Sequence, residues 1–322
     1  MANKNNEPLY IVQNPKSTRS ENMQELVIEP LREQKRDFEI YRTPSPDFET
    51  NVADMQAEIP AGARVISATG DGTAAQLVNA SLRGEKDWTF GFAPGGNFND
   101  LHSVHTGEGI SILDLVDEDA PVVELRPLTV ELDGKYWRHS AAYFSLGWAA
   151  LATGEFARPE IRERMRHTRH DQRLRRSLAY VAMNYLRHGR KKLPEFTIDN
   201  SEKQRRSTDI IAAVNPRIAK ILRTEHDFSS QLQFGSRHDI DVAHPARNTS
   251  FIRGILRGRT PLERRDTMRV TFEDVAHVPA QTEGEFTYID ARDVFMYKNP
   301  TDVVRVVHTA RATTVSKLAR AA

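Results

Sequence analysis

The chain has 322 residues, with 45 Lys and Arg against 44 Asp and Glu, so its formal net charge at pH 7 is +1. This balance argues against a general nucleic-acid binder, whose affinity depends on positive charge. The hydrophobic content of 39% is typical of a globular protein. The length predicts about two domains.

The sequence contains no cysteine, which excludes disulfides, cysteine-ligated metal sites and thiol catalysis. Met1–Pro8 is polar and lacks the apolar core of a secretory signal. No segment approaches the roughly 20 apolar residues of a membrane-spanning helix. We therefore expect a cytoplasmic protein.

The first third of the chain alternates between strand and helix patterns. Leu9–Gln13 is an apolar run that ends at the turn signal Asn14–Pro15. Further strands are predicted over Phe38–Arg42, Arg64–Ala68 and Trp88–Phe92. One helix is predicted over Ser20–Lys35, with an interruption at Pro30, and another over Gly72–Leu82. A further helix is predicted to follow Ser45, which would be its N-cap. This alternation predicts a parallel sheet covered by helices.

Short β-rich segments dominate from Val122 to Tyr297 and predict a second, mostly antiparallel domain. We expect an α/β domain over residues 1–124, a β-rich domain over 125–300 with a basic helical insertion at about 158–190, and a segment over 301–322 that returns to the first domain.

The predicted insertion is strongly basic. Arg158–Lys192 carries twelve Lys and Arg against three acids. Such a charge run is commonly a solvated helix face, but it also suits a surface that meets anionic phospholipids. A third interpretation is that individual arginines reach bound phosphates.

The strongest chemical signal is Ser67–Thr73 (SATGDGT), at the junction of a strand and a helix. Glycines at 70 and 72 would let a ligand approach the backbone, and the following helix would point its N–H groups at the turn, as phosphate requires. Asp71 would repel phosphate unless Mg²⁺ bridges the two. A tight turn with Asp71 as a helix cap is the alternative.

A second glycine turn, Ala93–Asp100 (APGGNFND), follows the next predicted strand, and the first strand ends at Asn14–Ser17. The carboxyl ends of neighbouring parallel strands meet at one edge of a sheet, where such folds bind ligands. Three turns of this kind at one edge favour a phosphate site.

These three segments resemble the N-terminal signatures of the diacylglycerol kinase catalytic-domain family, roughly NPxSG, GGDGT and PxGTxNDxA. The family includes bacterial lipid kinases and sphingosine kinases. Weaker similarity continues at Phe144–Gly147, Arg176–Tyr180 and Gln281–Glu285 (QTEGE), the last resembling a QxDGE segment.

The resemblance implies an α/β nucleotide-binding domain, similar to that of NAD kinases and diacylglycerol kinases, and a β-sandwich-like lipid domain, with the active site in the cleft between them. It implies transfer of a phosphoryl group from ATP, with Mg²⁺, to a lipid hydroxyl at a membrane surface. The implied nucleotide-binding residues are Asn14, Lys16, Ser17, Thr43, Thr69, Gly70, Asp71, Gly72, Thr73, Gly95, Gly96 and Asn97. Asp71 would help to hold the Mg²⁺ of Mg·ATP, in part through water, and Glu283 would accept the proton of the lipid hydroxyl.

Several positions depart from the family patterns. In the first two motifs, Thr18 replaces the glycine of NPxSG and Thr69 replaces the first glycine of GGDGT. Ala75–Gln76 replaces the Asn-Glu that usually follows GGDGT, and Asn97 replaces the Thr of PxGTxND. In the second domain, Arg237–Asp241 lacks the Asp-Gly of DGxLD, and Glu283 replaces the Asp of QxDGE. A kinase of a non-lipid acceptor, such as NAD, and a lipid- or nucleotide-binding relative without turnover therefore stay open. An unpaired edge strand could also join two copies into a homodimer.

Overall fold

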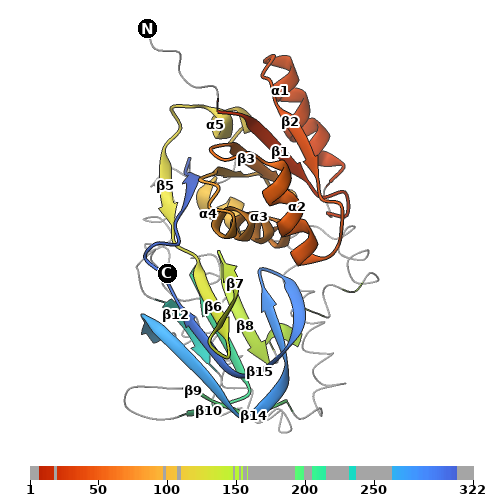
Figure 1. Ribbon diagram of the computed structural model, residues 1–322. Coiled ribbons are helices and arrows are strands. Elements are labelled where there is room, and N and C mark those ends of the chain that lie inside the picture. Colours follow the sequence, from red (N-terminus) through yellow and green to blue (C-terminus); the bar gives the residue numbers. More distant parts are fainter. Residues whose placement is uncertain are drawn as a thin grey trace, which may run out of the picture. The chain divides into compact units, whose positions relative to one another are not determined.

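The computed structural model describes residues 7–17, 20–96, 99–106, 110–147, 149–151, 154, 158, 193–198, 205–214, 232–236 and 263–309. The chain divides into two units, Met1–Pro127 with Pro300–Ala322, and Leu128–Asn299. Each unit contains its own β-sheet (Figure 1).

The first unit contains a six-stranded sheet with the order β2-β1-β3-β4-β16-β5. The strands are β1 (Leu9–Gln13), β2 (Glu39–Arg42), β3 (Arg64–Ala68), β4 (Thr89–Phe92), β5 (Val122–Leu125) and β16 (Val304–Val307). All neighbours pair in parallel except β16 and β5, which are antiparallel. β3 is buried along its whole length, as expected for a parallel strand covered on both faces.

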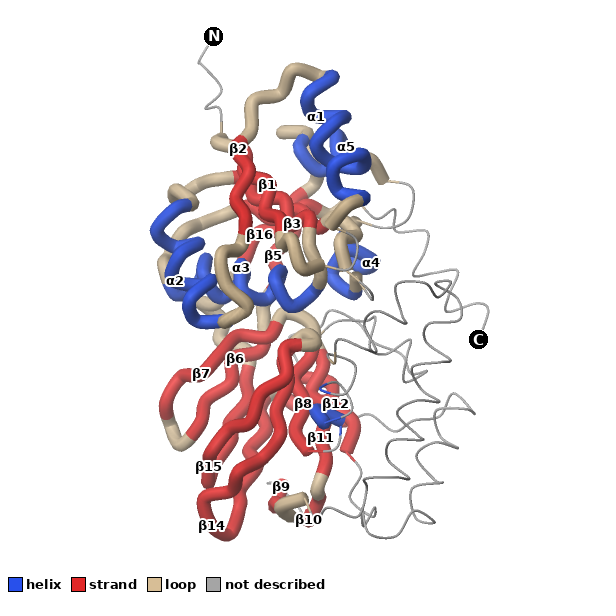
Figure 2. Tube along the Cα trace, turned by 90° about the vertical axis from the view of Figure 1, so that its right-hand side faces the viewer, coloured by secondary structure: helices blue, strands red, loops and turns tan. Residues whose placement is uncertain are grey.

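Helices cover both faces of this sheet (Figure 2), with α2 and α3 packed together on one face and α1 and α5 on the other. They are α1 (Glu29–Glu33), α2 (Phe48–Glu58), α3 (Asp71–Arg83), α4 (Asp100–His105) and α5 (Ile112–Val116). The N-cap of α2 differs from the predicted Ser45. Asp47 is the N-cap, and its carboxylate accepts a hydrogen bond of 2.7 Å from Thr50 N.

The predicted interruption at Pro30 takes the form of a π-helical turn, η1 (Gln24–Ile28), which leads into α1. Pro30 then stands in the first turn of α1, where a missing N–H removes no hydrogen bond within the helix. The N–H of Glu29 reaches back to the carbonyl of Gln24, five residues earlier. The longer turn thus lets one helical path continue through a proline.

The last described strand, β16, lies between β4 and β5 in the first sheet, although it follows the whole second unit in the chain. The residues after it bind the end of α4. Thr309 N donates to His105 O at 3.0 Å, and the rings of His105 and His308 meet edge to face with centroids 5.7 Å apart. His105 is 2% exposed, so a histidine lies inside the contact between α4 and the C-terminal strand.

The second unit contains a ten-stranded sheet in which all pairs are antiparallel. Its strands are β6 (Leu128–Leu132), β7 (Lys135–Ser140), β8 (Tyr143–Gly147), β9 (Phe196–Ile198), β10 (Arg205–Ser207), β11 (Asp209–Ala213), β12 (Leu232–Ser236), β13 (Glu263–Arg265), β14 (Thr267–Thr282) and β15 (Glu285–Tyr297). β14 and β15 form a long hairpin that turns at Glu283–Gly284.

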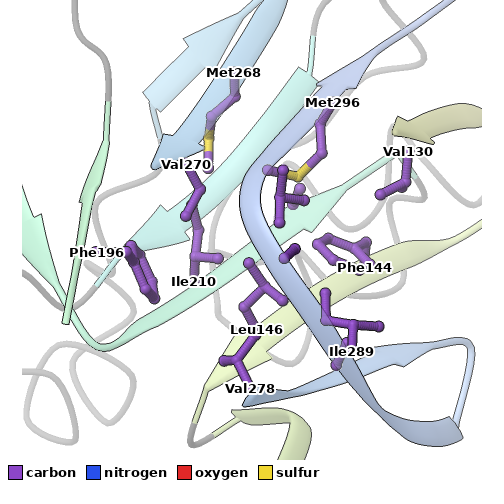
Figure 3. Packing of buried hydrophobic residues seen from close by; sticks show 14 of the residues in the cluster. Val130, Phe144, Leu146, Phe196, Ile210, Met268, Val270, Val278, Ile289 and Met296 are labelled. Carbon is purple, nitrogen blue, oxygen red and sulfur yellow. The ribbon is translucent and has the colours of Figure 1, made fainter. Parts of the chain in front are cut away.

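The core of the second unit is a cluster of buried side chains from six strands (Figure 3). Phe144 and Leu146 of β8 meet Val278 of β14 and Ile289 of β15 in it. These residues alternate with residues on the opposite face of each strand, as the two-residue period of a strand requires. The core therefore holds β8 and the β14–β15 hairpin in one register.

The predicted fold class is confirmed: the N-terminal unit is α/β with a parallel sheet, and the C-terminal unit is antiparallel β. The predicted basic helix at 158–190 lies outside the described residues except for Arg158. None of the described helices is long and apolar enough to cross a membrane.

The burial of His105 predicts an acid-sensitive first unit. Burial, and to a lesser extent the charge of His308, lowers the pKa of His105 to about 3, whereas a histidine in an unfolded chain has a pKa near 6.5. Below about pH 6.5 the unfolded chain therefore binds more protons than the folded chain, and the free energy of unfolding decreases as the pH is lowered. We expect His105 to contribute a loss of about 2 kcal/mol between pH 7 and pH 5.

Urea unfolding of the wild-type protein and of His105→Phe at both pH values measures this loss. The variant should lose less stability than the wild type on acidification. His277→Gln, at an exposed histidine, serves as the control and should retain the full loss. An equal loss in His105→Phe and wild type would contradict the assignment.

Candidate active site

The turn after β1 is joined to the first turn of α3 by one side chain. Asn14 Nδ2 donates to Thr73 Oγ1 at 2.9 Å, and Asn14 Oδ1 accepts from Lys16 N at 2.9 Å. Ser17 N donates to Asn14 O and closes the turn. Three residues predicted from the first segment therefore lie at the same sheet edge as Thr73.

The N-terminus of α3 faces this edge without a side-chain cap. Gly70 is the N-cap residue, and no side-chain hydrogen bond caps the helix there. A helix of 13 residues leaves unbonded N–H groups and a partial positive charge at its start. The Thr73 hydroxyl adds a polar group in the same turn. This arrangement suits an anion such as a phosphate group.

The turn after β4 packs directly on the turn after β3. A Cβ on Gly96 would lie 2.5 Å from Gly70 Cα, and a Cβ on Gly95 would lie 2.7 Å from Thr69 Cα. None of these glycines has a positive φ, so ease of backbone rotation does not explain them. The glycines are required because two backbones touch. We call residues 14–17, 69–73 and 93–96 the turn cluster.

Asn99 holds the β4 turn in this position. It has a left-handed φ of +53°, and its Oδ1 accepts a hydrogen bond of 2.6 Å from Gly96 N. The sequence motif contained Asn99 but did not indicate this role. Asparagine tolerates the left-handed conformation better than most residues, and this preference was the sequence signal that could have indicated the role of Asn99.

Asp71 points toward the N-terminus of α4. Its Oδ1 accepts from Leu101 N at 3.2 Å. Burial raises the pKa of Asp71, and backbone N–H groups that include those of Leu101 and Asp100 partly oppose the shift. Asp71 also lines a small pocket with Asn99 and His102. Burial is therefore unfavourable for the ionised form of this carboxylate, which lies within the turn cluster.

The other predicted residues of the first unit are also placed near this edge. Thr43 is buried one residue after β2, and its N–H bonds to Gln13 O at the end of β1. Thr69 is buried with its hydroxyl 2.7 Å from that of Ser67, and Gly72 is the second residue of α3. Asn97 lies outside the described residues.

Glu283 belongs to the second unit and is buried, with 2% exposure, rather than solvated as a surface turn would be. It occupies the β14–β15 turn with φ of +43°, next to Gly284 with φ of +86°. Two successive left-handed residues are typical of a type I′ hairpin, in which Asn or Asp is preferred before Gly. A glutamate here is strained, and strained residues occur often at functional sites.

The Glu283 carboxylate is bound by the link between β7 and β8. Its Oε1 accepts from Ser140 Oγ and from Ala142 N, both at 2.6 Å, and from Tyr143 N at 3.3 Å. We call residues 140–143 the carboxylate-binding turn. Sequence reasoning missed it, because Ser140 precedes Glu283 by 143 positions and no local pattern connects them.

Comparison with known proteins finds a match for the part of the first unit that contains the turn cluster. Residues 8–118 match the family model of the diacylglycerol kinase catalytic domain. The matched residues include the whole turn cluster and Thr43, and they end before the carboxylate-binding turn. None of the curated proteins has a matching sequence.

Solved structures share the fold over nearly the whole chain. A diacylglycerol kinase from Bacillus anthracis str. Sterne is 13% identical, with a TM-score of 0.59 over 94% of this chain and 98% of that one. Two structures from the same organism, whose descriptions propose that activity, have TM-scores of 0.63 and 0.62 at the same identity and coverage. At this identity the likeness establishes the fold, which extends through both units.

The backbone contact in the turn cluster predicts a graded response to alanine. Gly96→Ala brings a Cβ within 2.5 Å of Gly70 Cα, whereas the nearest atom to a Cβ on Gly70 is Gly96 Cα at 3.2 Å. We expect Gly96→Ala to lower the free energy of unfolding by about 1–3 kcal/mol and Gly70→Ala by less. Denaturant unfolding of the two variants measures this order, and the reverse order would contradict the contact.

The buried hydrogen bonds of Glu283 predict a second effect on stability. Glu283→Ala leaves the Ser140 hydroxyl and the Ala142 N–H without the carboxylate, and hydrogen bonds to a charged group are worth about 1.5–3 kcal/mol. We expect a loss of that size in the free energy of unfolding. The control is Glu273→Ala, at an exposed glutamate of β14, for which we expect less than about 0.5 kcal/mol.

Proposed function

We propose that the chain is an ATP-dependent lipid kinase that transfers the γ-phosphoryl group to a hydroxyl of a lipid such as diacylglycerol or a sphingoid base. The observation that carries the proposal is the uncapped N-terminus of α3 inside the turn cluster, in a segment that matches the diacylglycerol kinase catalytic domain. Transfer of a phosphoryl group depends mainly on positioning and on neutralising charge.

The turn cluster supplies groups that suit the phosphates of ATP. The first N–H groups of α3 and the Thr73 hydroxyl are polar groups at one sheet edge, and Asn14 fixes Thr73 there. Lys16 and Ser17 would bind from the β1 turn, Thr43 from the end of β2, and Gly95, Gly96 and Asn97 from the β4 turn. This set is the proposed nucleotide site, together with Thr69, Gly70 and Gly72.

Asp71 is the proposed residue that holds Mg²⁺, through water where needed. Its raised pKa reflects burial of a carboxylate, and a cation nearby would offset that effect. No group of three or more metal-ligating side chains exists among the described residues, which fits a metal carried by the triphosphate better than a resident one. Bound Mg·ATP would supply the phosphoryl group and neutralise its charge.

Glu283 is the proposed proton acceptor. As the lipid oxygen forms its bond to the γ-phosphorus, the bond between that phosphorus and the β–γ bridging oxygen would break and ADP would leave, while the hydroxyl proton would pass to the carboxylate of Glu283. The N–H and O–H donors of the carboxylate-binding turn favour the ionised form of this group, which is the form that can accept a proton.

The lipid would come from a membrane surface, and we propose that the protein is cytoplasmic and binds membranes peripherally. The basic stretch Arg158–Lys192 would provide the attraction to anionic headgroups, on the order of 1 kcal/mol for each basic residue near the surface. The lipid would be bound by the second unit.

The test is transfer of labelled γ-phosphate from Mg·ATP to a panel of lipids in mixed micelles, with NAD as a non-lipid acceptor. We expect a labelled lipid with the wild type, and losses of at least about 100-fold in kcat with Asp71→Asn and Glu283→Gln. Thermal unfolding verifies that each variant is folded.

Three results would contradict parts of the proposal. Labelled NADP in place of a labelled lipid would make the protein a kinase of a soluble acceptor. ATP binding without transfer to any acceptor would favour a binding protein without turnover. Full activity of Glu283→Gln would remove Glu283 from its proposed role while leaving the kinase assignment intact.

A further inference from the structure

The replacement of Asp by Glu at position 283 has a structural counterpart in the same unit. The side chain of Glu283 lies against the carboxylate-binding turn, where Ser140 Oγ and Ala142 N each donate to Oε1 at 2.6 Å. Its backbone is bonded to the same turn, because Glu283 N donates to Tyr143 O at 3.3 Å. Both ends of the residue are therefore held by one link between two strands.

We propose that Ser140 is a positioning residue for Glu283, and that the carboxylate-binding turn fits a glutamate at this position better than the aspartate of the family pattern. The inference rests on the proposed function, in which Glu283 accepts the lipid proton. Nothing in the sequence around Ser140 indicates such a role.

Burial strengthens the hydrogen bond from Ser140 Oγ to Glu283 Oε1. Ser140 is fully buried and Glu283 is 2% exposed, so water does not compete for the carboxylate oxygen. A short hydrogen bond from a hydroxyl to an ionised carboxylate is among the stronger ones in proteins. The Ser140 hydroxyl thus limits rotation of the carboxylate, and the N–H of Ala142 limits its position along the turn.

Side-chain length decides whether glutamate or aspartate at position 283 can accept hydrogen bonds from the carboxylate-binding turn. The backbone of residue 283 is fixed by the hairpin, with φ of +43° and a bond to Tyr143 O. Aspartate is shorter by one carbon–carbon bond, roughly 1.5 Å. From the same backbone it would not reach both donors, and a misplacement near 1 Å can lower a rate on the order of 100-fold.

The chain offers a matched control in Ser145. Ser145 is also buried, and its hydroxyl donates to Gln281 Oε1 at 2.7 Å. The hydrogen bond of Ser145 joins β8 to Gln281 of β14, whereas that of Ser140 joins the end of β7 to Glu283 in the turn after β14. Removing either hydroxyl deletes a buried hydrogen bond to a side chain of the hairpin, so the comparison separates positioning from general stability.

The experiment measures kcat, KM for ATP and the pH dependence of kcat/KM for the full-length wild type, Ser140→Ala, Ser140→Thr and Ser145→Ala, with the lipid that the wild type phosphorylates. We expect Ser140→Ala to lower kcat about tenfold with KM for ATP within about twofold, and to move the acid limb of the profile to higher pH. Ser140→Thr should recover most of kcat, and Ser145→Ala should leave the profile unchanged.

Glu283→Asp gives a second test that does not depend on Ser140→Ala folding. We expect the aspartate variant to be less active than the wild type, by about 100-fold in kcat. Wild-type kcat in Ser140→Ala, equal effects of Ser140→Ala and Ser145→Ala, or full activity of Glu283→Asp would each overturn this inference alone. Absence of transfer by the wild type would overturn the proposed function, and this inference with it.

Discussion

The candidate site of the first unit depends on a contact between two backbones. The turn after β4 lies so close to the turn after β3 that Gly95 and Gly96 have no room for a Cβ. This contact places the β4 turn beside the N-cap of α3, and the Asn14–Thr73 hydrogen bond adds the β1 turn. An anion site made of N–H groups needs such close packing, since backbone groups cannot reach out as side chains do.

Both acidic residues of the proposed mechanism are held by backbone N–H groups. Asp71 accepts from Leu101 N at the start of α4, and Glu283 accepts from Ala142 N and Tyr143 N. Backbone donors have fixed directions and do not exchange partners as long basic side chains do. The two carboxylates are therefore pre-organised within their own units, which is the condition under which a charged group can act without reorganisation.

The local elements of the first unit were largely predictable. β1 and β3 have the predicted bounds, because apolar runs flanked by turn residues are strong local signals. The N-cap of α2 is Asp47 and not the predicted Ser45, a choice between two capping residues separated by Pro46 that only hydrogen-bond geometry resolves. Gly70 and Gly72 were expected to let a ligand approach the backbone. The close contact between the two turns gives a separate reason for glycine at Gly70, Gly95 and Gly96.

The sequence by itself determined the order of strands and helices in the first unit and the two classes of sheet, because these depend on local patterns. Tertiary structure alone decided that β16 lies beside β4, and that the Glu283 carboxylate binds Ser140. Both are contacts between residues far apart in the chain, set by strand register and by packing. Neither leaves a periodicity or a motif that a single sequence can reveal.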